Sequence, residues 1–179
     1  GASLVKAGLT GRQTVDALGI KLGDRVLISG ALGMVGRAAI QYLQEIGAKP
    51  VAGVRSERLE DARLLAGEAI DITKPPAEAT FDFAIGTVSA VTGNLIKHVR
   101  DGGQVASIVQ IPEGANADHR VTIHELRHRT DVDTLNAVLK AASEGALIIP
   151  IAKTLLLSEI GAAQSAVAEG VQGKVTLKH

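Results

Sequence analysis

The stretch RVLISGALGMVGRAAIQ, residues 25–41, joins a short apolar run to an amphipathic helix through a loop that contains three glycines. The run VLI is typical of a buried strand, and Val35, Ala39 and Leu43 recur at the spacing of one helix face. Gly47 follows at the place where a residue in the left-handed conformation would end this helix. The stretch therefore predicts a strand, a tight turn and a helix in that order.

Short β-branched runs alternate with helical stretches along most of the chain, and this alternation predicts an α/β fold whose parallel sheet is covered on both faces. We expect a doubly wound, six-stranded sheet with the strand order 3-2-1-4-5-6. The strands are predicted at Arg25–Ser29, Pro50–Val54, Ala69–Ile72, Phe83–Thr87, Gln104–Val109 and Val121–Leu126. Further helices are predicted near Arg58–Ala66, Val91–Arg100 and Val132–Ser143, with turns at Pro75–Pro76, Asp101–Gly103 and Pro112–Gly114.

The sequence pattern changes at about residue 151. A strand-like KTLLL at 153–157 is followed by a predicted helix at Ser158–Glu169 and a last predicted strand at Lys174–Lys178. We therefore expect residues 1–150 to form the main domain and residues 151–179 to form a distinct C-terminal segment.

The composition favours a small-molecule partner. The 179 residues, 46% of them hydrophobic, suffice for one well-buried domain, and 19 basic residues balance 19 acidic ones. Neither nucleic acid nor an anionic membrane is therefore an expected partner. There are no cysteines, and no apolar run approaches the roughly 20 residues of a membrane span. Because the start lacks a signal-peptide pattern, we expect a cytoplasmic protein, and its non-Met start indicates trimming or excision from a longer chain.

The three glycines of the loop have separate expected tasks. Gly30 lets the chain leave the strand, Gly33 lets the backbone approach a ligand, and Gly36 lets the helix pack closely. Backbone amides at the start of the helix suit a pyrophosphate, because unpaired N–H groups and the helix dipole act together. No GK[ST] sequence follows, which argues against a nucleoside triphosphatase. The context favours a dinucleotide over the alternatives, an ordinary tight turn or another nucleotide.

The end of the second predicted strand distinguishes the two nicotinamide dinucleotides. An acidic residue there would bind the ribose hydroxyls of NADH, but the chain reads AGVRSERLE. Arg55, Ser56 and Arg58 suit the 2′-phosphate of NADPH better than a diol. Two alternatives stay open: a solvated loop of surface arginines, and a ribose contact from Glu57.

Residues 124–128, HELRH, match the zinc-binding pattern H-E-x-x-H, which requires a helix. This segment falls in the sixth predicted strand, where His124 and His128 would lie about 13 Å apart, too far for one metal. We therefore expect no metal site. His98, His119 and His179 are expected at the surface, and no general acid or base stands out, so the catalytic residues stay unknown.

Several segments together resemble the medium-chain dehydrogenase/reductase superfamily, and in particular its zinc-independent quinone oxidoreductase branch. The segment AGLTGRQTVDALGIKLGDRVLISGALGMVGRAAIQYLQEIGA is similar to the start of the family's cofactor-binding Rossmann domain. RSERLEDARLLAGEAID, FDFAIGTV, DGGQVASI, LNAVLKAASEGALIIPI and GKVTLK are similar to later family segments. The resemblance covers nearly the whole chain.

The resemblance implies an NADPH-dependent oxidoreductase that delivers hydride to a quinone, an enone or a related carbonyl substrate. It implies that the loop wraps the pyrophosphate and that other residues contact the 2′-phosphate or line the cofactor further along. The loop residues are Ala31, Leu32, Gly33, Met34, Val35 and Gly36; Arg55, Ser56 and Arg58 would face the 2′-phosphate, and Thr87 and Val88 would line the cofactor. The chain departs from the family at Met34, Arg12, Gly86 and Ser89, which bears on cofactor affinity and nicotinamide placement.

The resemblance also implies a partner domain. Family members have a GroES-like domain before the AGLT segment, and it forms the other wall of the substrate cleft. We expect the chain without it to bind cofactor with little turnover, and residues 153–179 to lack their usual packing or to pair with a second copy. Two alternatives stay open: a non-catalytic NADPH-binding or sensing module, and a structural protein with a degenerate cofactor site.

Overall fold

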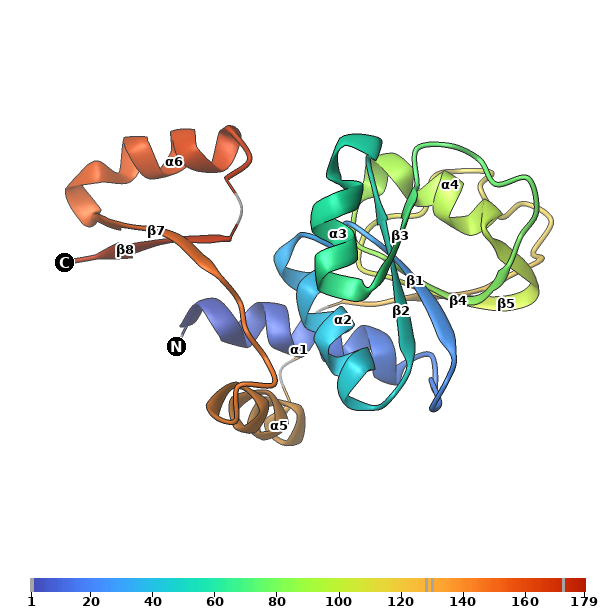
Figure 1. Cartoon of the computed structure of the whole chain (residues 1–179), viewed down its shortest axis with the longest axis horizontal. Helices are drawn as coiled ribbons and strands as arrows, with labels where there is room; N and C mark the ends of the chain where they lie inside the picture. Colours follow the sequence, from blue (N-terminus) through green and yellow to red (C-terminus); the bar gives the residue numbers. More distant parts are fainter. Residues whose placement is uncertain (1, 128, 130, 172) are drawn as a thin grey trace.

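The computed structural model describes residues 2–127, 129, 131–171 and 173–179. Six parallel strands form one sheet in the order β3-β2-β1-β4-β5-β6, as predicted (Figure 1). The strands are β1 Arg25–Ser29, β2 Lys49–Val54, β3 Glu68–Asp71, β4 Phe81–Gly86, β5 Val99–Ser107 and β6 Thr122–Glu125. The main helices are α1 Ala2–Asp16, α2 Met34–Glu45, α3 Leu59–Ala66, α4 Thr92–Lys97 and α5 Val132–Ser143, with short 3-10 turns η1 Ser56–Arg58 and η2 Ser89–Val91.

The side chains of β1 alternate between two hydrophobic layers, because successive residues of a strand point to opposite faces. Val26 and Ile28 pack with residues of α2 and α3 on one face, while Leu27 packs with Leu95 and Ile96 of α4 on the other. All three β1 side chains are fully buried. The sheet is therefore doubly wound, and β1 lies at its centre with parallel neighbours on both sides.

The helix α1 is an element that the sequence reading did not identify. Gly8 and Gly11 lie inside it, and glycine is a poor helix former. Packing explains both residues: a Cβ atom on Gly11 would lie 2.7 Å from the Cβ of Ala38 in α2, and one on Gly8 would lie 2.6 Å from Val138 Cγ1 in α5. The glycines let α1 approach two other helices closely.

The helix predicted at Val91–Arg100 is shorter than expected, and the turn predicted at Asp101–Gly103 is wrong. The helix α4 ends at Lys97, and β5 runs from Val99 through Asp101–Gly103 to Ser107. The glycine pair disrupts the strand without ending it, because Gly102 has φ +79° and the pairing with β4 shifts register there. A bulge accounts for this local irregularity.

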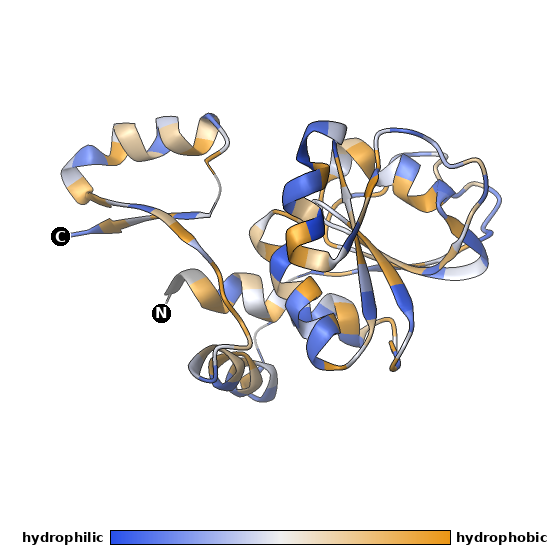
Figure 2. Cartoon of the chain, viewed as in Figure 1, coloured by the Kyte–Doolittle hydropathy of each residue, from blue (hydrophilic) through white to orange (hydrophobic). Residues whose placement is uncertain are grey.

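The C-terminal residues form a small βαβ unit, which we call the C-terminal unit. It consists of β7 Ile151–Leu156, the 3-10 turn η3 Leu157–Glu159, α6 Ile160–Ala168 and β8 Lys174–Lys178, and β7 and β8 pair in parallel. Figure 1 shows the unit standing beside the six-stranded domain. Figure 2 shows hydrophobic residues along α6 and β7 as well as inside the large sheet. The large hydrophobic side chains of the C-terminal unit that are exposed are Ile151, Leu156, Leu157, Ile160, Val167 and Leu177.

Among the described residues, no helix is both long enough and apolar enough to cross a membrane.

Candidate functional site

A crevice of about 520 Å³ opens at the carboxyl ends of the strands. It lies where the chain reverses its direction of winding between β1 and β4, which is where open α/β sheets bind ligands. We call it the switch-point crevice. It is lined by Gly30, Leu32, Gly33, Gly53, Val54, Arg55, Arg58, Ile72, Thr73, Val88, Ala90 and Val91.

The glycines of the loop differ in the space around them. Gly30 has φ +66°, and a Cβ atom there would lie 2.3 Å from Thr87 Oγ1. A Cβ atom on Gly36 would lie 2.4 Å from the carbonyl oxygen of Gly30, so Gly36 allows α2 to pack against the loop. Gly33 is exposed, and its Cβ atom would meet only that same carbonyl oxygen, at 3.1 Å. The space beside Gly33 is therefore left open toward a ligand.

Two arginines line the switch-point crevice at the end of β2, and no acidic side chain lines it within the described part of the chain. Arg55 is exposed and forms an ion pair with Glu57, with Nε and Oε1 3.2 Å apart. Arg58 is partly buried, and its Nε donates a hydrogen bond to Asp61 Oδ2 at 3.0 Å. Arg55, Arg58 and Val88 thus lie together with Gly30, Leu32 and Gly33.

The remaining residues expected at the cofactor lie beside the crevice and do not line it. Ser56 begins the exposed turn η1. The Thr87 hydroxyl donates to the carbonyl oxygen of Ser29 at 2.7 Å, and the Thr87 amide donates to Ser29 Oγ at 3.2 Å. Ala31 and Gly36, at the two ends of the loop, are buried. Thr87 and Ser29 therefore connect the ends of β4 and β1.

Two further cavities continue from the switch-point crevice. The basic cavity, of about 500 Å³, shares Leu32, Gly33 and Arg58 with the crevice and is also lined by Met34, Arg37 and parts of the C-terminal unit, including Lys174. The outer cavity, of about 570 Å³, lies beyond the ends of β1, β5 and β6. It is lined by Lys6, Ala7, Thr10, Met34, Val35, Ile108, Leu126, Arg127 and Lys174. Shared residues make the three spaces one path across the sheet edge.

Arg37 is a candidate residue that the sequence reading missed, because an arginine in the first turns of a helix has no distinctive sequence signal. It is partly buried, and its Nε donates a hydrogen bond to the carbonyl oxygen of Leu32 at 3.0 Å. Desolvation by burial lowers the pKa of Arg37, and the nearby positive charge of Arg58 lowers it further. The two guanidinium groups therefore lie close enough to repel each other.

The HELRH segment does not form the helix that its zinc-binding pattern requires. His124 lies in β6, and its Nε2 is 2.9 Å from Gln104 Oε1 of β5. His128 lies outside the described residues. Among the residues that the structure does describe, no three His, Cys, Asp or Glu side chains are grouped to hold a metal ion.

The expectation that His98 lies at the surface is wrong. Its residue surface is 7% exposed, and its ring meets Phe81 edge to face, with centroids 6.5 Å apart. Burial lowers the pKa of His98, so the neutral ring is favoured. His98 lies away from the three cavities.

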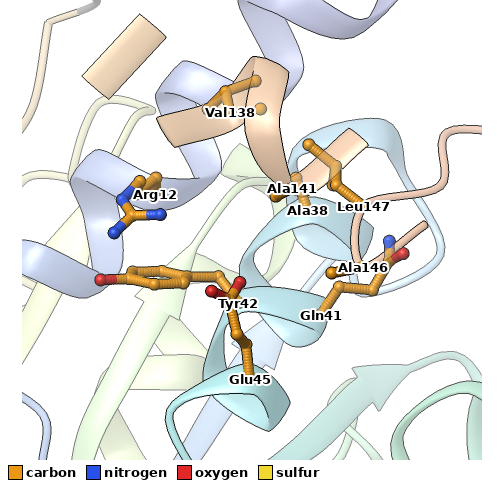
Figure 3. Close-up of a pocket in the computed structure, with 10 residues that line it drawn as sticks. Arg12, Ala38, Gln41, Tyr42, Glu45, Val138, Ala141, Ala146 and Leu147 are labelled. Atoms are coloured by element: carbon orange, nitrogen blue, oxygen red, sulfur yellow. The ribbon is translucent and has the colours of Figure 1, made fainter. Parts of the chain in front are cut away.

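Arg12, one of the departures from the family pattern, lies on α1 and faces Tyr42 of α2. Its guanidinium group lies over the ring of Tyr42 at 4.1 Å from the centroid (Figure 3). The Tyr42 hydroxyl donates to Asp16 Oδ1 at 2.9 Å. The crevice drawn in Figure 3 encloses only about 20 Å³, the space of a single water molecule. Arg12 thus packs between helices and lines none of the three cavities.

Comparison with solved structures finds close matches to the whole fold. An NAD-dependent alcohol dehydrogenase matches with a TM-score of 0.84 at 26% identity, over 99% of this chain and 58% of that one. The quinone oxidoreductase from Coxiella burnetii matches with a TM-score of 0.82 at 26% identity, over 99% of this chain and 60% of that one. An alcohol dehydrogenase superfamily protein from Novosphingobium aromaticivorans matches with a TM-score of 0.82 at 23% identity, over 98% and 63%. No protein-family model and no curated protein matches the sequence.

The solved structures that the chain resembles are alcohol dehydrogenases and quinone oxidoreductases of the medium-chain superfamily, and the chain has the fold of their Rossmann part. It spans about three fifths of the length of these proteins. These proteins differ in substrate, and the first alcohol dehydrogenase is NAD-dependent.

Proposed function

We propose that the chain is the NADPH-binding domain of an oxidoreductase that transfers hydride to a quinone, an enone or a related carbonyl substrate. The observation that supports NADPH is the pair Arg55 and Arg58 at the end of β2, in a crevice that no described acidic side chain lines. Guanidinium groups bind phosphate with charge-assisted hydrogen bonds, whereas a ribose diol is better matched by a carboxylate.

The residues present fit a dinucleotide laid along the path of three spaces. The adenosine half would occupy the switch-point crevice between Val54 and Val88, and the pyrophosphate would lie over Gly33 at the start of α2. The nicotinamide end would reach the outer cavity, beside Val35 and Ile108. When bound, NADPH supplies the hydride, and the chain binds and orients it.

A substrate would be reduced in the outer cavity, beside the nicotinamide end of the coenzyme. The apolar residues of this cavity, Met34, Val35, Ile108 and Leu126, would lie against the nicotinamide end of a bound coenzyme and would limit the access of water to it, which favours hydride transfer over side reactions. We propose that a further domain of the GroES-like type covers this opening and supplies the remaining contacts to substrate. No acid or base of this chain is assigned to the reaction.

The cofactor assignment is tested by calorimetric titration of the chain with NADPH and NADH. We expect Arg55→Ala to weaken NADPH binding by about tenfold or more and to leave NADH binding unchanged, since one charge-assisted hydrogen bond is lost. Gly33→Val should weaken the binding of both nucleotides without unfolding the loop, because its Cβ atom would have only the carbonyl oxygen of Gly30 within 4 Å. Arg63→Ala, an exposed change on α3 that lines no cavity, is the control.

The outcomes separate the candidate functions. If neither nucleotide binds, the oxidoreductase proposal fails and a structural role replaces it. Tighter binding of NADH than of NADPH would reverse the coenzyme choice alone. A sensing module would bind NADPH but stay inactive when supplied with a GroES-like partner domain.

A further inference from the structure

The basic cavity holds more positive charge than its surroundings neutralise. Arg37 from α2, Arg58 from η1 and Lys174 from β8 line it, and no acidic residue lines it in the described part of the chain. The nearest carboxylate partner is Asp61, whose Oδ2 lies 2.9 Å from Arg58 Nη2. The Asp61 carboxylate thus pairs with Arg58, and its effect on the pKa of Arg37 is smaller than the opposing effects of burial and of Arg58.

Both arginines have hydrogen-bond donors to spare. The Arg37 side chain donates from Nε to a neutral carbonyl oxygen, and its terminal N–H groups have no hydrogen-bond partner among the described residues. Arg58 Nη2 is buried and, despite its contact with Asp61, makes no hydrogen bond of acceptable geometry. Arg58 Nη2 is a buried donor that lacks a well-aligned acceptor, and leaving such a donor unsatisfied is costly. An anion between the two side chains would supply this acceptor and would also accept hydrogen bonds from the terminal N–H groups of Arg37.

The position of Arg58 decides which anion this would be. Arg58 lines the basic cavity beside Arg37, and it also lines the switch-point crevice beside Gly53 and Val54, where the adenosine ribose would lie. A group attached to that ribose and bound by Arg58 therefore reaches the side of the loop on which Arg37 lies.

We propose that Arg37 is a coenzyme-specificity residue, which binds the 2′-phosphate of NADPH together with Arg58 from the basic cavity. The inference rests on the proposed NADPH-binding function. It adds a residue from α2 to Arg55 and Arg58, the two arginines near the end of β2 that are proposed to bind the 2′-phosphate. The Nε hydrogen bond to Leu32 holds the guanidinium group in place, so that little side-chain freedom is lost when the phosphate binds.

The alternative is that Arg37 only braces the glycine loop through the Leu32 carbonyl. This structural role would affect both nucleotides equally, since NADPH and NADH share the pyrophosphate that lies on the loop. A role in 2′-phosphate binding would affect NADPH alone. The ratio of the two dissociation constants therefore distinguishes them.

The test measures dissociation constants of the chain for NADPH, NADH, adenosine 2′,5′-bisphosphate and AMP by calorimetry. The variants are Arg37→Met, which keeps the length of the side chain, Arg37→Lys, which keeps the charge, and Arg63→Gln as a control outside the cavities. Thermal melting of each variant checks that it is folded. Inorganic phosphate, titrated alone, shows whether the cavity binds the anion without the nucleoside.

We expect Arg37→Met to weaken NADPH and adenosine 2′,5′-bisphosphate by about 10- to 100-fold, while NADH and AMP change less than about twofold. Arg37→Lys should restore part of the NADPH affinity, because the charge remains but the planar fork is lost. Equal weakening of NADPH and NADH, or no change in either, would overturn the role of Arg37 and leave the proposed function standing. Failure of the unaltered chain to bind NADPH would overturn both.

Discussion

At the scale of single residues, His98 shows how burial changes the chemistry of one side chain. Its neutral ring is packed against Phe81, and its Nε2 is buried without a hydrogen-bond partner among the described groups. Because the folded-state pKa is lowered, the unfolded chain binds more protons near pH 6 than the folded chain does. Protonation of His98 therefore opposes folding.

We predict that the free energy of unfolding falls as the pH drops through the unfolded-state pKa of histidine, about 6.5, toward the lower folded-state value. Replacement by leucine, His98→Leu, should make the loss of stability between pH 7.5 and pH 5 smaller. Urea unfolding at the two pH values measures this. The exposed change His179→Gln serves as the control, and an unaltered pH dependence in His98→Leu would contradict the prediction.

The residues of the candidate site were predictable where their role depends on the neighbouring sequence. Gly30, Gly33 and Gly36 could be assigned from the spacing of the loop, because each solves a backbone problem that the strand-to-helix turn creates. Arg37 could not, since its significance depends on Arg58, which is distant in sequence and brought near only by the fold. His98 was misjudged for the same reason: a single polar residue carries no sign of the layer that will cover it.

At the scale of elements, the contact between α1 and α2 depends on a missing side chain. We predict that Gly11→Ala destabilises the protein by about 1–3 kcal/mol, because the new methyl group would lie 2.7 Å from the Cβ of Ala38 and 2.8 Å from the amide nitrogen of Ala39. Alanine is the better helix former, so propensity alone predicts the opposite sign.

Chemical denaturation of Gly11→Ala and of the matched change Gly93→Ala tests this. Gly93 also lies in a helix, α4, but a Cβ atom there meets nothing within 4 Å. We expect Gly93→Ala to be neutral or slightly stabilising. A stable Gly11→Ala protein would show that α1 can move away from α2 at little cost.

The elements that the sequence predicted well are those with a regular pattern. The run PVAGV in β2, whose five residues are all buried, and the apolar face of α2 have strong sequence signals. The order of the six strands is the one that the doubly wound dinucleotide-binding fold implies. The helix α1 was not predicted, because the glycines that allow its close packing weaken the helical pattern of the sequence. The start of β5 was not predicted, because its glycine pair is locally typical of a turn.

At the scale of the whole molecule, the two main hydrophobic layers end before the C-terminal unit begins. Of the residues that the structure describes, none beyond Leu126 belongs to these two layers, and the small cluster between α1, α2 and α5 reaches only Ile149. The buried residues of α6, Ala163 and Ala166, lie outside these clusters. The large sheet is therefore expected to be stable without residues 151–179.

We predict that a chain ending at Pro150 unfolds cooperatively in urea, with a midpoint close to that of the 179-residue chain. Circular dichroism would follow the loss of secondary structure, and hydrogen exchange of the β1 backbone amides would follow the opening of the large sheet. Loss of the cooperative transition would show that the C-terminal unit contributes to the central core.

The bonds between Thr87 and Ser29 bear on how tightly any ligand can be held. The loops that leave neighbouring strands at a reversal of winding lead to opposite faces of the sheet. Here the Thr87 hydroxyl and the Ser29 side chain hold the ends of β4 and β1 together by hydrogen bonds within the protein. The strand ends beside the crevice are thus held in place by the protein itself before a ligand arrives. Binding then costs less entropy, because these strand ends do not have to be ordered by the ligand.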